Sequence, residues 1–156
     1  MTRQVRRCPQ LCTALAILAG AGSAAAARDL YRIKSLKGDA YPAPEAWRVA
    51  LRYDVRIKDF DPRVEYELLL HVTEDGRPLQ DQDGQAVQQV VPLRQPEIDK
   101  KGEARFVGQA EGNVPTGLVK DVKHLRVQAT LFIVRDSRPL ATKQTGLKVH
   151  KPSCDW

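Results

Sequence analysis

Apolar and polar residues alternate strictly along one stretch of the chain, residues 47–57. Every odd position there is apolar, whereas the even positions, apart from Ala50, are charged. Successive side chains of a β-strand point to opposite faces, so this pattern predicts a strand with one buried and one solvated face. The alternation returns at residues 66–72 and 125–133. We therefore expect these side chains to point into the core: Trp47, Leu51, Leu70, Val127 and Leu131.

Weaker strand patterns occupy four more segments, residues 30–36, 85–91, 104–110 and 140–149. Turn-forming residues fill the intervals: 39–44, 58–63, 74–84, 92–102, 112–119 and 135–139. No long helical period follows residue 27. Seven short strands separated by turns predict an all-β fold, an antiparallel β-sandwich, with a small β-barrel as the alternative.

In chain order the seven strands can be placed on the immunoglobulin or fibronectin type III plan. The segment Val-Pro-Thr-Gly at residues 114–117 resembles the proline-containing turn of the latter. The resemblance concerns the fold alone, because no pair of cysteines flanks a core tryptophan and Leu125 stands where a corner tyrosine would be expected.

The first 27 residues have the three-part layout of a secretory signal peptide. A basic start is followed by an apolar run at about residues 11–19 and by a tract of small residues that ends at Ala27. The apolar run is shorter than the ~20 residues that span a bilayer, which argues against an uncleaved anchor. We expect cleavage after Ala27. The remaining chain should then consist of a single sandwich domain at residues 28–150 and a tail at 151–156. The mature protein should be periplasmic or secreted.

Composition adds one restriction. The formal net charge of the whole chain is +6, but Arg3, Arg6 and Arg7 lie in the leader, which leaves +3 on the rest. Generic binding to nucleic acid therefore has little compositional support. The basic row Arg48, Arg52 and Arg56 is interrupted by Asp54, and we expect Arg56 to face Glu65 or Glu67 on the next strand, unless that connection crosses to the other sheet.

Cysteine usage leaves a single thiol in the mature chain. Cys8 and Cys12 belong to the leader, so Cys154 is the one cysteine that remains. An internal disulfide is therefore impossible. Cys154 would be either a free thiol on a tail or half of an intermolecular disulfide.

Motifs for chemistry are absent from the sequence. The serines of the mature chain lie outside any nucleophile elbow, and His71, His124 and His150 lack metal-ligand spacing. The segment 81–84 (Asp-Gln-Asp-Gly) contains part of a calcium loop, but it is also an ordinary turn, which is the interpretation we favour. We expect no cofactor and no metal.

Candidate binding residues follow from the sandwich plan. Alternate loops meet at one end, so residues 58–64, 92–103 and 135–138 should lie together. Within them Phe60, between Asp59 and Asp61, is an aromatic in a polar loop, and Ile98 is a second apolar residue. Phe60 would either contact a ligand or fold back onto the core, and the second outcome has the greater weight.

These features favour an exported, non-catalytic binding module for an unknown protein or carbohydrate. One alternative is a small secreted hydrolase that uses loop carboxylates. Another is a structural component of the cell envelope that assembles through an edge strand or Cys154.

Overall fold

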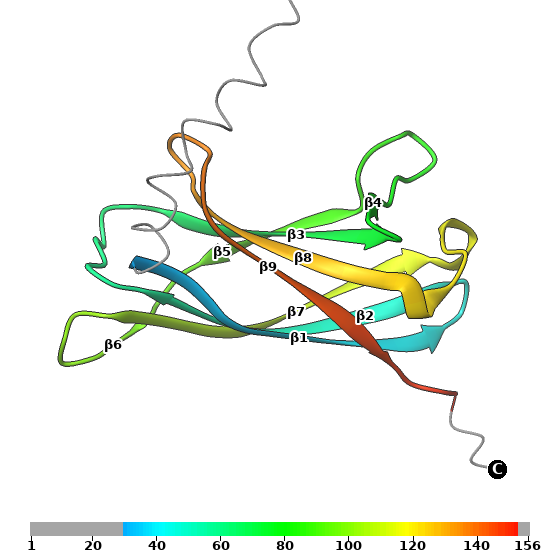
Figure 1. Ribbon diagram of the computed structural model, residues 1–156, viewed down its shortest axis with the longest axis horizontal. Coiled ribbons are helices and arrows are strands. Elements are labelled where there is room, and N and C mark those ends of the chain that lie inside the picture. The colour runs from blue at the N-terminus through cyan, green and yellow to red at the C-terminus, as the bar shows by residue number, and fades with distance from the viewer. Residues whose placement is uncertain (1–29, 153–156) are drawn as a thin grey trace, which may run out of the picture.

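The strands lie in two layers (Figure 1). The computed structural model describes residues 30–152. In chain order the elements are β1 (Tyr31–Ala43), β2 (Ala46–Ile57), β3 (Tyr66–Glu74), β4 (Arg77–Pro78), β5 (Gln88–Leu93), β6 (Glu97–Ile98), β7 (Ala104–Pro115), the 3-10 turns η1 (Thr116–Leu118) and η2 (Val122–His124), β8 (Leu125–Ile133) and β9 (Arg138–Val149).

Strand pairing defines the topology. One layer has the order β1-β2-β7-β6, and the other has β9-β8-β3 with β4 and β5 both paired to β3. β9 belongs to both layers, because it pairs antiparallel with β8 through Gly146 and then parallel with β1 from Leu147 to Val149. Without the two-residue strands β4 and β6, seven strands remain. The first, second and fifth of these (β1, β2 and β7) share one sheet, and the third, sixth and seventh (β3, β8 and β9) share the other, as in immunoglobulin-like sandwiches. The predicted β-sandwich is confirmed.

The barrel alternative is wrong. Closure would require pairing between the two outer strands, β5 and β7, and within residues 30–152 no such pairing occurs. The sandwich is therefore bridged by β9 on one side only.

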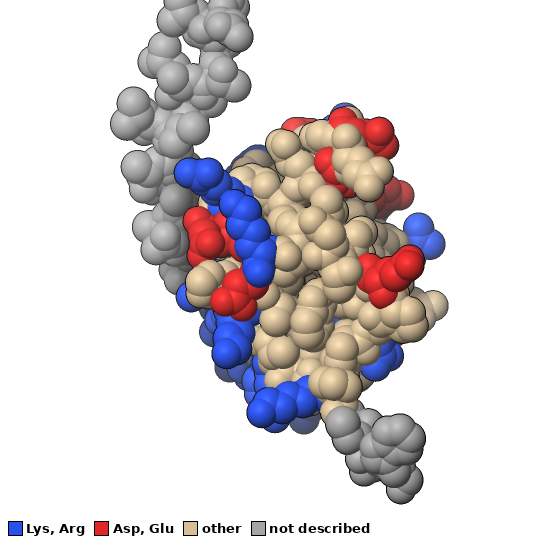
Figure 2. Space-filling view, turned by 90° about the vertical axis from the view of Figure 1, so that its right-hand side faces the viewer, with Lys and Arg blue, Asp and Glu red and all other residues tan. Residues whose placement is uncertain are grey.

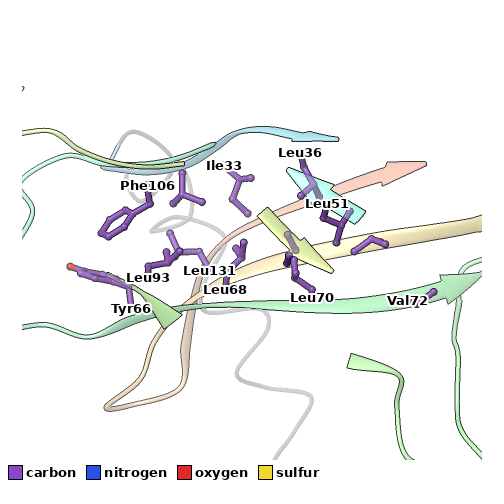
Figure 3. Packing of buried hydrophobic residues seen from close by; sticks show 14 of the residues in the cluster. Ile33, Leu36, Leu51, Tyr66, Leu68, Leu70, Val72, Leu93, Phe106 and Leu131 are labelled. Carbon is purple, nitrogen blue, oxygen red and sulfur yellow. The ribbon is translucent and has the colours of Figure 1, made fainter. Parts of the chain in front are cut away.

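The core lies between the layers and follows the alternation of the sequence. Val55, Ile57, Leu68 and Leu131 have no exposed surface, and Figure 3 shows side chains of both sheets meeting along this interior. Leu51, Leu70 and Val127 are also buried, as expected. Trp47 is an exception: it is only half-buried, because it lies at the start of β2, next to the chain reversal.

Two strands are longer than the turn chemistry indicated. β1 continues through the segment expected to be a turn, up to Ala43, and the chain reverses at Glu45, whose φ is +59°. β7 likewise continues to Pro115. In both cases buried side chains sustain the strand: Ala40 has no exposed surface and Val114 only 2%. Tertiary burial therefore overrides the preference of Gly, Asp and Pro for turns.

Candidate functional site

Three connections meet at one end of the sandwich, as the loop alternation predicts. They form a groove of about 470 Å³ beside β6, at the left of Figure 1. A backbone hydrogen bond from Val134 to the Glu65 carbonyl, 3.0 Å long, ties the β8–β9 turn to the β2–β3 loop. The groove is lined by Phe60, Pro62, Val64, Glu65, Tyr66, Glu67, Pro92, Leu93, Arg94, Gln95, Pro96, Ile98 and Val134.

Local backbone chemistry shapes this groove. Pro92 and Pro96 fix φ on either side of Gln95, which adopts a left-handed conformation with φ +55° as the chain crosses from β5 to β6. In the opposite loop, the Asp61 carboxylate accepts a hydrogen bond from the Arg63 amide at 2.9 Å. Such Asx turns hold the chain reversal in place. The rims of the groove are thus built from turn residues with few alternative conformations.

Phe60 faces the core rather than solvent. Its ring centroid lies 5.9 Å from that of Tyr66 and 5.8 Å from that of Phe106, in tilted and edge-on geometries that aromatic pairs prefer. Figure 3 shows Tyr66 and Phe106 close together at this end of the core. Burial raises the pKa of Tyr66 to about 12. Phe60 therefore covers the end of the core, the outcome given greater weight above, although part of it still lines the groove.

Ile98 is the prominent apolar residue of the groove. It lies in β6, opposite the buried Ala104 of β7, and 58% of its surface is exposed. Val134 is 36% exposed on the other side. Their position on separate connections makes this an apolar surface assembled by the fold. The sequence indicated Ile98 as an apolar residue in a polar loop but contained no comparable signal for Val134.

The two predicted carboxylates do not join this groove. Asp61 is engaged by Arg63, whose Nε lies 3.1 Å from its Oδ1, and this contact lowers the pKa of Asp61. Asp59 is exposed, with φ +51° at the head of the turn. The structure brings Phe60 and Ile98 to one groove and leaves Asp59 and Asp61 beside it.

A charged cluster lies on the outer face of the sheet formed by β1, β2 and β7. Asp54 receives hydrogen bonds from Arg56 (3.0 Å) and Arg105 (3.2 Å), and Arg56 also reaches Glu103 at 3.5 Å. The expected pairing of Arg56 with Glu65 or Glu67 is wrong, because β2 pairs with β1 and β7 while β3 belongs to the other layer. The connection crosses between sheets, the alternative noted above.

A second cluster secures the end of β9. Nε2 of His150 and Oδ1 of Asp39 lie 2.9 Å apart, and the imidazole stacks on Tyr41 with centroids separated by 4.4 Å. Arg48 covers the Tyr41 ring at 4.7 Å. The hydrogen bond with His150 lowers the pKa of Asp39. Sequence reasoning missed this cluster because its members come from β1, from β2 and from the residue that follows β9, and no local spacing reveals such a contact.

The opposite end of the molecule carries a hollow of about 440 Å³ between β3, β4 and η1. Figure 2 shows this end: uncharged residues cover its centre, and charges of both signs lie around them. The Glu74 carboxylate accepts hydrogen bonds from the amides of Lys120 (2.8 Å) and Asp121 (3.1 Å). Its charge is used to hold the η1–η2 connection, so this hollow is a weaker candidate for ligand binding.

The Asp-Gln-Asp-Gly segment has the geometry of a turn. The Asp81 carboxylate accepts hydrogen bonds from the amides of Asp83 and Gln85, both 2.9 Å, and Gly84 has φ +75°. Asp99 caps the next such turn in the same way through Lys101 and Glu103. Over residues 30–152 no group of three or more His, Cys, Asp or Glu side chains is placed to hold a metal. The predicted signal peptide (residues 1–27) and Cys154 lie outside the described residues.

No helix in the described part of the chain is long and apolar enough to cross a membrane. No family model and no curated protein matches the sequence. The solved structures that resemble it include HBP35 of Porphyromonas gingivalis (14% identity, 81% of this chain and 44% of that one, TM-score 0.49). A domain of an outer membrane lipoprotein from the same organism also matches (9% identity, 75% of this chain and 89% of that one, TM-score 0.40). A calcium binding mutant of Bacteroides uniformis beta-glucuronidase 2 matches as well (16% identity, 74% of this chain and 12% of that one, TM-score 0.42).

The chain therefore spans less than half of the first of these proteins and a small part of the glucuronidase. With TM-scores below 0.5, these similarities support neither a family assignment nor a ligand.

Proposed function

We propose that this chain is an exported, non-catalytic binding module, and that its ligand site is the groove beside β6. The observation that carries the proposal is the exposure of Ile98, 58%, in a groove lined by three separate connections. Exposed apolar residues gathered in one concave surface are typical of interaction sites.

A protein segment is a better ligand for this groove than a sugar ring. Carbohydrate binding commonly uses an accessible aromatic face, and Phe60 and Tyr66 pack against each other and against the core. The accessible groups are instead aliphatic, Ile98 and Val134, with Arg94 and Glu65 among the polar lining residues. An extended segment with one or two apolar side chains and a charged neighbour matches this composition.

The hydrolase alternative has less support. The carboxylates that line the groove are Glu65, just before β3, and Glu67 within β3, so both come from one side of the groove, whereas Asp59 and Asp61 lie outside it. Two-carboxylate catalysis needs groups that flank the reacting bond from separate positions. Export itself rests on the leader pattern of residues 1–27.

The groove can be tested with a displayed library of random peptides. Wild-type protein should select apolar peptides, and Ile98→Asp should fail to retain them, because a charge in the groove would have to be desolvated on binding. Val90→Asp is the matched control, since Val90 is 49% exposed on β5 and lies outside the groove. Both variants should keep the wild-type melting temperature. Equal retention by both would refute the proposed site, and binding of glycans alone would refute the ligand class.

A further inference from the structure

The side of the sandwich that β9 does not bridge exposes part of the core. A slot of about 90 Å³ lies there between β5 and β7. Its walls include the buried side chains of Leu51, Leu70, Val72 and Val127, and Gln89 is among the polar residues that line it.

Small residues of β7 contribute to the slot. Ala110 and Gly112, two of its inward positions, line the slot together with Val114. Gly108, the inward position before them, is covered by Tyr53 of β2. Between Phe106 and Val114, no bulky side chain of β7 therefore projects into the interior.

The outer edge of β7 lacks most of the features that usually protect an edge strand. β6 covers only Ala104 and Arg105, which leaves residues 106–114 without a partner on that side in the described part of the chain. Natural edges are protected by charged side chains, lysine above all, and by prolines, bulges or short length. This segment has nine residues, a single charged residue (Glu111), no proline and no register shift against β2. Val107 is 62% exposed within it.

We propose that β7 pairs antiparallel with β7 of a second copy of this chain, about a two-fold axis at Ala110. β6 ends the free edge at one side and η1 at the other, so the pairing that uses the whole segment centres on Ala110. Phe106 then lies opposite Val114 of the second copy, Gly108 opposite Gly112, and Gln109 opposite Glu111.

The charge pattern of the segment is compatible with pairing to a second copy of itself. Glu111 is the single charged residue of residues 106–114, and in this register it faces a neutral amide. An isologous pairing therefore brings no like charges together. It also places Val107 of each copy beside Asn113 of the other, which covers one flank of this exposed side chain.

Position 109 tests this register, because two substitutions there have opposite expected effects. Gln109→Glu places a carboxylate opposite Glu111 twice in each dimer, whereas Gln109→Lys places an ammonium there twice. We expect Gln109→Glu to raise the Kd of the dimer, and Gln109→Lys to lower it, each by roughly 2- to 30-fold. Sedimentation equilibrium on the chain purified from an exporting host measures both, with reductant present so that Cys154 cannot join two molecules.

Monomer stability provides a second readout that separates pairing from folding. Within one chain Gln109 lies opposite Arg52, so Gln109→Glu should raise the melting temperature of the monomer and Gln109→Lys should lower it. Gln144→Glu and Gln144→Lys, on the exposed face of β9, should leave the dimer constant unchanged. A chain that stays monomeric up to about 1 mM, or a dimer that ignores both changes at position 109, would overturn the proposal.

Discussion

At the scale of single residues, Gly108 is constrained by its neighbour across the sheet. It lies opposite Tyr53 in the β2–β7 pair, and a Cβ at Gly108 would overlap the Tyr53 ring and hydroxyl. Burial raises the pKa of Tyr53, which agrees with a ring packed against the interior. The glycine is thus required by packing, since its φ is not in the left-handed region.

We predict that Gly108→Ala destabilises the fold by ~1–3 kcal/mol, the usual cost of overpacking. This direction is opposite to the ordinary gain from replacing glycine in a strand. Denaturant midpoints measure the change. In a Tyr53→Ala background the same substitution should cost little, and a stabilised Gly108→Ala protein would contradict the collision with Tyr53.

The orientation of Phe60 shows where residue-scale prediction ends. The sequence places this aromatic in a polar loop but contains no signal for the direction of its side chain. That direction depends on Tyr66 and Phe106, which are brought close by β3 and β7. A loop residue takes its orientation from partners that are distant in sequence.

At the scale of elements, β9 depends on the His150 cluster at its end. The His150 amide donates a hydrogen bond to the Ala40 carbonyl at 2.9 Å, beyond a parallel pairing of only three residues. We predict that His150→Ala speeds hydrogen exchange at residues 147–150 and leaves residues 138–146, which pair with β8, unchanged. His124→Ala, an exposed histidine in η2, is the control. Equal protection of residues 147–150 in wild type and His150→Ala would show that the contacts of the His150 side chain with Asp39 and Tyr41 do not stabilise the end of β9.

Strands with a complete alternation were predictable almost to the residue, as in β2, β3 and β8. Their apolar faces contact the core over most of their length, so burial and sequence period agree. β1 and β7 extend through Gly, Asp and Pro residues, because their neighbours continue to pair with them. Pairing across the sheet could not be read from the chain, and the assignment of Arg56 to Glu65 or Glu67 was wrong for that reason.

At the scale of the whole molecule, the free energy of unfolding should depend on pH through the ionisation of Asp54. Burial raises the pKa of Asp54, but the hydrogen bonds and charges of Arg56 and Arg105 outweigh it and leave that pKa below 3.8. A carboxyl group with a lowered pKa in the folded state stabilises the fold above its unfolded pKa and loses this contribution as pH falls through the folded value.

We therefore predict that Asp54→Asn is less stable than wild type at neutral pH, and that the difference narrows as pH falls below about 4. Urea unfolding at a series of pH values measures it. Asp83→Asn, in an exposed turn, should leave the profile unchanged. If the difference in unfolding free energy between wild type and Asp54→Asn stays constant down to the lowest pH, the ionised Asp54 makes no contribution to stability.

The groove could be predicted only in part. Alternation of loops in a sandwich brings three connections to one end, and this much follows from strand order. The contribution of residues 92–98 depends on how the chain crosses from β5 to β6 between two prolines, which the sequence indicated only as a turn.

The membership of β9 in both layers also sets the order of folding events. β9 is the last strand to be synthesised, yet it is an inner strand between β8 and β1, which belong to different sheets. A chain that emerges N-terminus first can form the β1–β2 hairpin early, but no strand pairs the two layers until residues 138–149 have appeared. Contacts between the first and last strands are slow to form because a long loop must close first. The strand bridge between the two sheets can therefore close only after residues 138–149 have been synthesised.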